Sequence, residues 1–235
     1  YENIQKHTLS YLSRAGIKPD NITVIVSAHD NQLADYLTLP CKVLVTDANR
    51  IGEVHNFITE YYDEGEFIVE LDDDIRHIKN KDLENILNFE ELMSTAKQLL
   101  IDNDASYCGT YSVPNKMFMN KSKEYSYDLR YCLGLIRFRF IRKSVKLVTN
   151  YSEDFENCLR HYILDKKIIR MNHVCGVTSN YSKGGCDGSG RDIETEKADK
   201  VILCDLFPDY TTLYQRKNKR WDIRLKDKSQ RVILT

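Results

Sequence analysis

Apolar residues recur along the first 80 positions with two alternating periods, one typical of helices and the other of strands. Three segments have the spacing of amphipathic helices: 2–15, 32–37 and 53–62. Three short runs, rich in apolar residues and mostly β-branched, are typical of buried strands: 22–27, 42–46 and 66–71. This alternation predicts right-handed crossovers and a mostly parallel central sheet flanked by helices, which is an α/β fold.

The second half of the chain mixes the two periods. Helical patterns cover 82–100, 153–164 and 192–206, and strand patterns cover 106–113, 131–141 and 168–178. We expect a single domain over residues 1–235, made of a nucleotide-binding half (1–80), a mixed acceptor half (81–191) and a C-terminal helix with a basic tail (192–235). Sheets of this kind normally begin with a strand, so a first strand is expected upstream of Tyr1.

Composition narrows the class of protein further. Of 235 residues 42% are hydrophobic and 29% charged, which supports a sizeable core and excludes collagen-like and wholly disordered chains. No run approaches the roughly 18 apolar residues of a membrane span, and residues 1–10 lack the apolar core of a signal peptide. Seven scattered cysteines without a Cys-x-x-Cys pair predict reduced thiols, so a cytoplasmic protein is expected.

Three consecutive carboxylates, Asp72, Asp73 and Asp74, follow the third predicted strand directly. In open α/β sheets ligands bind beyond the carboxyl ends of the strands. Asp72 and Asp74 lie on one side of an extended backbone and would hold a hard divalent ion that in turn binds a diphosphate. The alternative is a solvated acidic turn that ends the strand.

Two further candidates for chemistry come later in the chain. Glu153 and Asp154 open a predicted helix, where an acid either serves as a general base or complements the helix dipole. His173, on the last strand of the second half, is either a metal ligand or a hydrogen-bonded structural histidine.

Cations gather in three places. One is a glycine-rich segment, which is either a loop without a functional role or a loop that closes over phosphates. It contains Lys183, Gly184, Gly185 and Arg191. Five cations interleave with phenylalanines: Arg137, Arg139, Arg142, Lys143 and Lys146. They predict either contacts to a nucleic-acid backbone or a strand with one wet face, and the basic tail has the same two interpretations.

The order of motifs resembles a known family. The relevant segments are 51–58 (Ile-Gly-Glu-Val-His-Asn-Phe-Ile), 67–75 with the three aspartates, 107–115 followed by Phe118-Met119, 128–130 (Asp-Leu-Arg), 153–156 and the glycine-rich loop ending at Arg191. Together, over roughly residues 3–191, they resemble the GT-A-type glycosyltransferases associated with TET/JBP base oxygenases. That group includes the base J glucosyltransferase and related phage and large-virus enzymes.

The resemblance implies a GT-A-like fold and a reaction. A sugar would pass from a nucleotide-sugar donor, a UDP-sugar such as UDP-glucose or a pentose donor, to a 5-hydroxymethylpyrimidine in DNA. Asp72 and Asp74 match the metal-binding Asp-x-Asp motif for Mn²⁺ or Mg²⁺, and Asp154 matches the acid that acts on the acceptor hydroxyl. Hydroxymethylated DNA is the expected partner, the enzyme is expected to be a monomer or weak dimer, and its place is the host cytoplasm if it is viral.

The resemblance also assigns the donor site. Donor-binding residues are expected at Arg50, Asn56, Asp72, Asp73, Lys183, Gly184, Gly185 and Arg191. The chain departs from the family pattern at His55, where the pattern has an arginine before Asn56, so Arg50 is expected to take over contact with the donor phosphates.

Two other functions stay open on the sequence. The first is a GT-A glycosyltransferase that acts on protein or glycan, and the second is an inactive module that keeps the fold for DNA binding. The salt dependence of product formation distinguishes transfer to DNA from transfer to protein or glycan, because binding to a phosphate backbone weakens steeply as salt is added.

Overall fold

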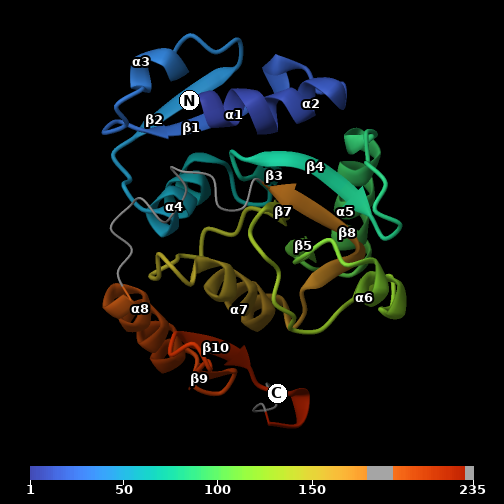
Figure 1. Cartoon of the computed structure of the whole chain (residues 1–235), viewed down its shortest axis with the longest axis vertical. Helices are drawn as coiled ribbons and strands as arrows, with labels where there is room; N and C mark the ends of the chain where they lie inside the picture. Colours follow the sequence, from blue (N-terminus) through green and yellow to red (C-terminus); the bar gives the residue numbers. More distant parts are fainter. Residues whose placement is uncertain (179–192, 231–235) are drawn as a thin grey trace.

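The computed structural model describes residues 1–178 and 193–230. Figure 1 shows the N-terminal elements at the top, the main sheet in the middle and the C-terminal elements at the bottom. The helices are α1 (Glu2–Ile4), α2 (Ser10–Arg14), α3 (Leu33–Tyr36), α4 (Ile51–Tyr61), α5 (Phe89–Asp102), α6 (Lys116–Lys121), α7 (Glu153–Asp165) and α8 (Ile193–Leu206), with single-turn or π-helical pieces at Gln5–Leu9, Pro19–Asn21 and Lys228–Gln230.

The strands form three sheets. They are β1 (Thr23–Ser27), β2 (Lys42–Thr46), β3 (Phe67–Leu71), β4 (Ile75–Asn80), β5 (Tyr107–Tyr111), β6 (Tyr125–Ser126), β7 (Ile136–Phe140), β8 (Ile169–Thr178), β9 (Thr211–Gln215) and β10 (Trp221–Leu225). β1 and β2 pair in parallel, β9 and β10 form an antiparallel hairpin, and the six-stranded sheet has the order β3-β7-β5-β8-β4 with β6 also on β8.

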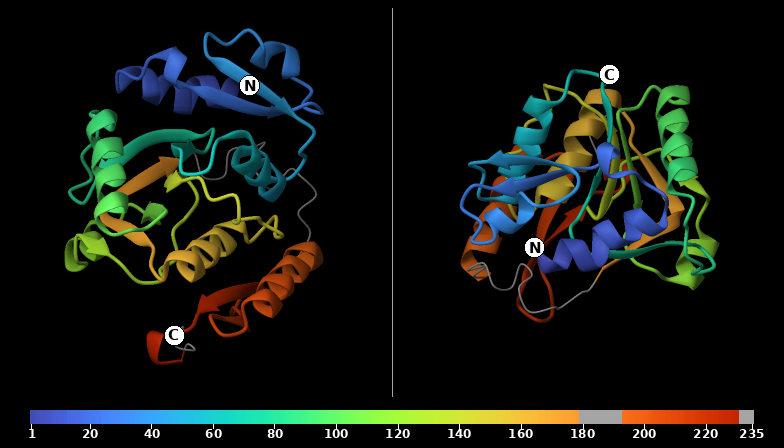
Figure 2. Two further views of the ribbon diagram at one scale, coloured as in Figure 1. Left: turned by 180° about the vertical axis from the view of Figure 1, so that it is seen from behind. Right: turned by 90° about the horizontal axis from the view of Figure 1, so that it is seen from above.

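The six-stranded sheet is mixed. Among its described strands only β5 and β8 run parallel as neighbours, while β3–β7, β7–β5, β8–β4 and β8–β6 pair in an antiparallel manner. The α/β class is thus confirmed in its coarse form, as a mixed, curled sheet flanked by helices, whereas a mostly parallel sheet is not confirmed. Figure 2 shows the helices on both sides of this sheet.

The two faces of the sheet have different chemistry. On one face Phe138 and Ile136 pack against α5 through Phe89, Ala96 and Leu100, all of which are almost fully buried. On the other face Tyr107 packs with Cys158 and Leu159 of α7, in a cluster that extends to α8 and the β9–β10 hairpin. Alternation along β7 sends its phenylalanines to the α5 face and its arginines to the α4 and α7 face.

Several predicted elements change in the structure. The helix predicted over 82–100 begins only at Phe89, because the side chain of Asn88 accepts a hydrogen bond from the amide of Glu91 and caps it. Residues 75–80 form β4, which the sequence pattern missed, since Ile75 and Ile78 enter the core with a spacing of three rather than two. The strand predicted over 131–141 is shorter, and the basic tail contains the β9–β10 hairpin.

The N-terminal helical segment fixes the acidic turn between β3 and β4. The hydroxyl of Thr8, 4% exposed, donates to the carbonyl of Asp72 at 2.6 Å and accepts from the amide of Ile75 at 2.9 Å. One buried hydroxyl therefore satisfies both ends of the turn that carries the three aspartates.

Thr8→Val keeps the volume of the side chain and removes both hydrogen bonds. It is expected to lower the free energy of unfolding by about 1–3 kcal/mol, because the Ile75 amide stays buried without a partner. Chemical denaturation measures this loss. Thr8→Ser keeps the hydroxyl and should lose about 1 kcal/mol for its methyl group; a valine variant as stable as the parent would contradict this role.

Candidate active site

The strand directions bring several segments to one edge of the sheet. β3, β5 and β8 run in the same direction, and β7 and β4 run against them. The edge therefore collects Asp72 after β3, the end of β5 at Tyr111, Leu135 before β7 and the end of β8 at Thr178. The amide of Asp72 donates to the Leu135 carbonyl at 3.1 Å, which continues the β3–β7 ladder into the acidic turn.

A buried ion cluster lies beneath this edge, on the α4 and α7 face. Glu70 of β3 sits opposite Arg137 of β7 in the register. Its carboxylate binds the Nε of Arg139, lies 2.8 Å from Nδ1 of His55 on α4 and 3.7 Å from Arg137. All four side chains are less than 10% exposed.

The charges of this cluster decide the ionisation of its members. Burial alone would raise the pKa of Glu70, but the charge of Arg139, the hydrogen bond from His55 and the charge of Arg137 hold it far below the ordinary value. The pKa of His55 is lowered, first by burial and then by Arg137. Glu70 is therefore an anion, and the cluster is a charged layer between the sheet and α4.

Arg137 extends the cluster to α7. Its guanidinium donates to Oδ1 of Asp154 at 2.6 Å, while Oδ2 of Asp154 lies 3.4 Å from the hydroxyl of Tyr131. Gly134 leaves the space for this pair, since a Cβ there would lie 1.7 Å from Arg137 and 2.0 Å from Asp154. Asp154 itself is 16% exposed, so its carboxylate is anchored and still within reach of solvent.

Two carboxyls at the edge are held in an unusual state. The pKa of Asp72 is raised to about 7, chiefly by burial and further by Asp154, Asp74 and Asp73, with Arg137 opposing. The pKa of Glu153 is raised to about 8 by burial and by Asp154. Asp72, Glu153 and Asp154 thus share one electrostatic environment, although Asp72 is far from the other two in the sequence.

The donor set fits a hard divalent cation in its chemistry. Carboxylate oxygens are the ligands that Mg²⁺ and Mn²⁺ prefer, and a cation beside Asp72 would relieve the repulsion that raises its pKa. Across residues 1–178 and 193–230, no three His, Cys, Asp or Glu side chains are arranged as a complete metal site. Asp72 and Asp74 remain the residues that the sequence predicted for such an ion.

The structure does not bring every predicted site residue to this edge. Asn56 binds the backbone of Leu147 with both amide atoms, at 2.8 Å each, and so ties α4 to the segment before α7. Arg50 is exposed at the start of α4, and Asp73 accepts from Asn3 at 3.2 Å. Lys183, Gly184, Gly185 and Arg191 lie outside the described residues.

His173 is separated from the acidic turn. It lies five residues before Thr178, the residue paired with Ile75, which is roughly 16 Å along β8 at the usual rise per residue. Its Nδ1 is 3.2 Å from the carbonyl of Glu124, and its ring meets Tyr125 edge-on at 5.2 Å. These contacts are those of a structural histidine.

Three of the five cations of 137–146 are used inside the protein, while Arg142 and Lys146 pair with the exposed Glu64 and Glu60. Arg137 and Arg139 are 3% and 1% exposed and bind acids, so the polar face of β7 is not the wet face that the sequence suggested. Lys143 donates to the carbonyls of Thr59, Glu60 and Tyr62 and closes the C-terminal end of α4. None of these three side chains is presented to a nucleic acid.

Sequence reasoning missed the residues that organise the site. On the sequence Glu70 is only part of an acidic stretch, Arg137 is assigned to nucleic-acid contacts or a wet face, and Tyr131 is part of a longer strand. The available signal was a glutamate inside an apolar strand directly before three aspartates, since a buried acid requires a cation on a neighbouring strand.

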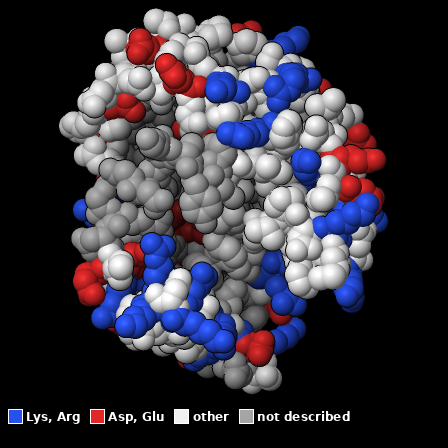
Figure 3. Space-filling model, viewed as in Figure 1, with Lys and Arg blue, Asp and Glu red and all other residues white. Residues whose placement is uncertain are grey.

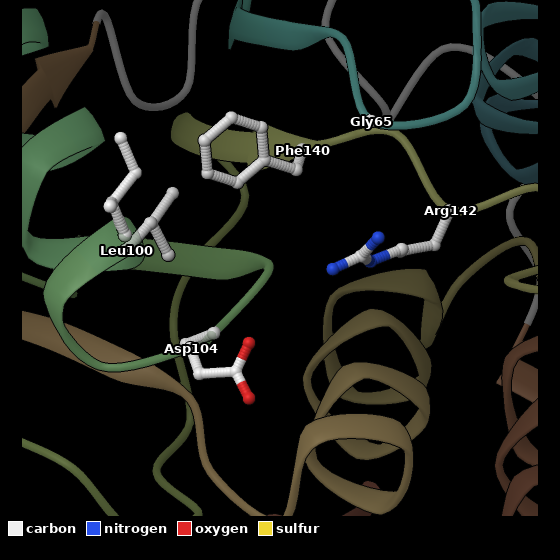
Figure 4. A pocket seen from close by; sticks show the side chains of 7 residues that line it. Gly65, Leu100, Asp104, Phe140 and Arg142 are labelled. Atoms are coloured by element: carbon white, nitrogen blue, oxygen red, sulfur yellow. The ribbon is translucent and has the colours of Figure 1, made fainter.

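A cavity lies at the opposite edge of the sheet. It has a volume of about 310 Å³ and is lined by residues that include Gly65 before β3, Phe140 at the end of β7 and Ala105 before β5. In Figure 4 the side chains of Asp104 and Arg142 extend toward this space. It is distinct from the Asp72 edge, because the same strands meet it with their other ends.

Comparison with known proteins gives no relative for this chain. No protein-family model matches the sequence, and neither the curated proteins nor the solved structures include a similar one. In addition, none of the helices among the described residues is both long and apolar enough to cross a membrane.

Arg137→Met leaves Glu70 and Asp154 buried without their shared cation. We expect the free energy of unfolding to fall by about 3–5 kcal/mol, because an uncompensated buried charge remains. Arg216→Met is the matched control: its pair with Asp222 is on the surface and should be worth less than about 1 kcal/mol. If urea denaturation gave similar losses of unfolding free energy for both variants, the buried Arg137 pairs would contribute no more than a surface ion pair.

Asp72→Asn tests the raised pKa through the dependence of stability on pH. A carboxyl with a raised pKa stabilises the native state below about pH 4, and this contribution is lost as pH rises through about 7. The change from 3.8 to about 7 corresponds to at most about 4 kcal/mol. The free energy of unfolding of the variant should therefore equal that of the parent at pH 4 and exceed it at pH 8, as measured by chemical denaturation at both pH values. The same difference in unfolding free energy at both pH values would contradict the raised pKa of Asp72.

Proposed function

We propose that this protein is a glycosyltransferase that moves a sugar from a nucleotide-sugar donor to the hydroxyl of a 5-hydroxymethylpyrimidine in DNA, with Mn²⁺ or Mg²⁺ bound at Asp72. One observation supports the reaction class above all. A carboxyl with a pKa near 7 lies beside a second carboxylate that Arg137 anchors, at the edge of the sheet where strand ends converge. The choice of sugar acceptor rests on the order of sequence motifs.

The residues around Asp154 support a division of roles. Asp154 keeps one oxygen on Arg137 and accepts from the Tyr131 hydroxyl at 3.4 Å with the other. Its side chain is 16% exposed, and in this proposal the second oxygen accepts the proton of an attacking hydroxyl. Glu153 has a pKa of about 8 and holds its own proton at neutral pH. Asp154 is therefore the base in this proposal, and Glu153 is a hydrogen-bond donor.

The cation would contribute at the other end of the reaction. Bound by Asp72, with Asp74 nearby, it would neutralise charge on the departing nucleoside diphosphate. Protons compete for Asp72 near its pKa of about 7, so cation binding weakens as pH falls.

The direct test incubates the protein with hydroxymethylated DNA, Mn²⁺ and a panel of nucleotide sugars, and reads the masses of the released nucleosides. We expect a nucleoside heavier by one sugar. Modification of a peptide or glycan instead would favour the transferase with another acceptor, and no donor turnover under any condition would favour the inactive module.

Asp154→Asn should lower the rate of transfer by about 10²–10⁴-fold, because the amide cannot accept a proton. Glu153→Gln, by contrast, should stay within about tenfold of the parent, since glutamine copies a protonated glutamate. Asp104→Asn, on an exposed residue at the far edge, controls for the loss of a carboxylate. Parental rates in the Asp154→Asn variant would remove Asp154 as the base.

Activity should rise with pH through about 7 at limiting Mn²⁺, as Asp72 loses its proton. Excess Mn²⁺ should shift this rise to lower pH, because the ion competes with the proton for the same carboxylate. Initial rates at two Mn²⁺ concentrations across pH 5–9 measure the effect. A profile that does not respond to Mn²⁺ would separate the titrating group from the cation site.

A further inference from the structure

The β9–β10 hairpin ends in a well-defined basic turn. The amide of Lys219 donates to the carbonyl of Arg216 at 2.9 Å, and the amide of Arg216 donates to the carbonyl of Arg220 at 2.8 Å. The side chains of Gln215 and Asn218 add bonds to the backbone within the turn. The sequence Arg-Lys-Asn-Lys-Arg is therefore held in one conformation rather than left as a loose tail.

A lysine occupies the position of this turn that normally suits glycine or asparagine. Lys219 has a φ of 66°, in the left-handed region that is unfavourable for most side chains. The turn thus keeps a cation at a position where glycine would relieve the backbone.

The turn is exposed and short of counter-charges. Arg216, Lys217, Lys219 and Arg220 are all exposed, and Asp222 binds Arg216 through its Nε at 2.6 Å. Between residues 210 and 230 there are seven lysines and arginines against two aspartates. Figure 3 shows blue side chains gathered at the lower end of the molecule, over α8, β9 and β10.

A chain of contacts links this hairpin to the helix that carries Asp154. Lys200 of α8 donates to the carbonyl of Trp221, the first residue of β10, at 2.9 Å. The adjacent Asp199 accepts from the amides of Asn150 and Tyr151 at 2.8 and 3.1 Å, directly before α7 begins at Glu153. The hairpin is thereby fixed, through α8, to the side of the molecule where the helix bearing Asp154 begins.

We infer that Lys217, Lys219 and Arg220, at the tip of this hairpin, hold phosphate groups of duplex DNA while a base is presented to Asp154. The inference rests on the proposed function for the identity of the polymer and for the role of Asp154; the phosphate contacts rest on the hairpin itself. A two-stranded ribbon is narrow enough to follow a groove of the duplex, and exposed lysine and arginine side chains bind phosphates. The arginines of β7 are buried in ion pairs and cannot supply these contacts.

The test measures binding of a fluorescent 20-base-pair DNA duplex by anisotropy between 50 and 200 mM salt. The triple variant K217Q/K219Q/R220Q should reduce the slope of log affinity against log salt by about 2 to 3, which is the expected release of counterions from three phosphate contacts. A triple variant with the parental slope would overturn the inference.

The matched control is K81Q/K121Q/K123Q, which removes the same charge from exposed lysines around α6. It should keep the parental slope; an equal loss in both triple variants would overturn the inference in favour of nonspecific attraction. A duplex RNA bound as tightly as the DNA, with the same dependence on the tip, would also overturn the assignment to DNA.

Lys219→Gly removes one charge of the turn in a variant whose hairpin is expected to fold. Glycine relieves the left-handed position, so thermal stability should stay equal or rise, and the slope should still fall by about 1. An unchanged slope in this folded variant would count against Lys219 as a phosphate contact.

The two proposals fail separately. Loss of DNA binding in the tip variant, with no transfer by the parent protein to hydroxymethylated DNA, would leave the hairpin site standing and remove the glycosyltransferase. Transfer by the parent protein, with unchanged DNA binding in the tip variant, would support the glycosyltransferase and remove the hairpin as the DNA-binding site.

Discussion

The contact on which the rest of the site depends is the shared cation Arg137 between Glu70 and Asp154. It joins β3, β7 and the first turn of α7 through a guanidinium that is almost fully buried, and it has room only because Gly134 has no side chain. A buried pair of this kind adds little net stability, but the removal of one partner is strongly destabilising. The cluster therefore restricts geometry: with Arg137 in place, α7 has one position relative to the edge of the sheet, and Asp154 has one orientation.

The number of charges explains the raised pKa values at the edge of the sheet. Four acids, Glu70, Asp72, Glu153 and Asp154, lie within the influence of Arg137 and Arg139. His55 adds no lasting charge near neutral pH, because burial and the arginines lower its pKa. Two acids are thus left over, and the raised pKa values of Asp72 and Glu153 are the result. Near neutrality protons balance this excess, and a cation of the kind proposed for Asp72 would compete with them.

The local pattern of the sequence predicted the first helix, the strands up to residue 71 and the acidic turn after the third of them, because each is set by short-range periodicity. It did not predict the environment of β7. Alternation of arginine with phenylalanine shows that the two faces differ, but whether the polar face is wet depends on Glu70 and Asp154, which are 67 and 17 residues from Arg137. The same limit applies to His173, whose distance from the acidic turn is set by the pairing of β4 with β8.

The protein has two sets of cations, and burial separates their physical roles. Arg137, Arg139 and Lys143 are bound to carboxylates or carbonyls within the fold, where salt screens them little. The lysines and arginines at the tip of the β9–β10 hairpin lie in solvent, where their attraction to an anionic partner is released by added salt. A low net charge of −1 is therefore compatible with a basic turn at the tip of the hairpin, because acids elsewhere in the chain balance its charge. The distribution of charge between interior and surface, rather than its sum, carries the information about partners.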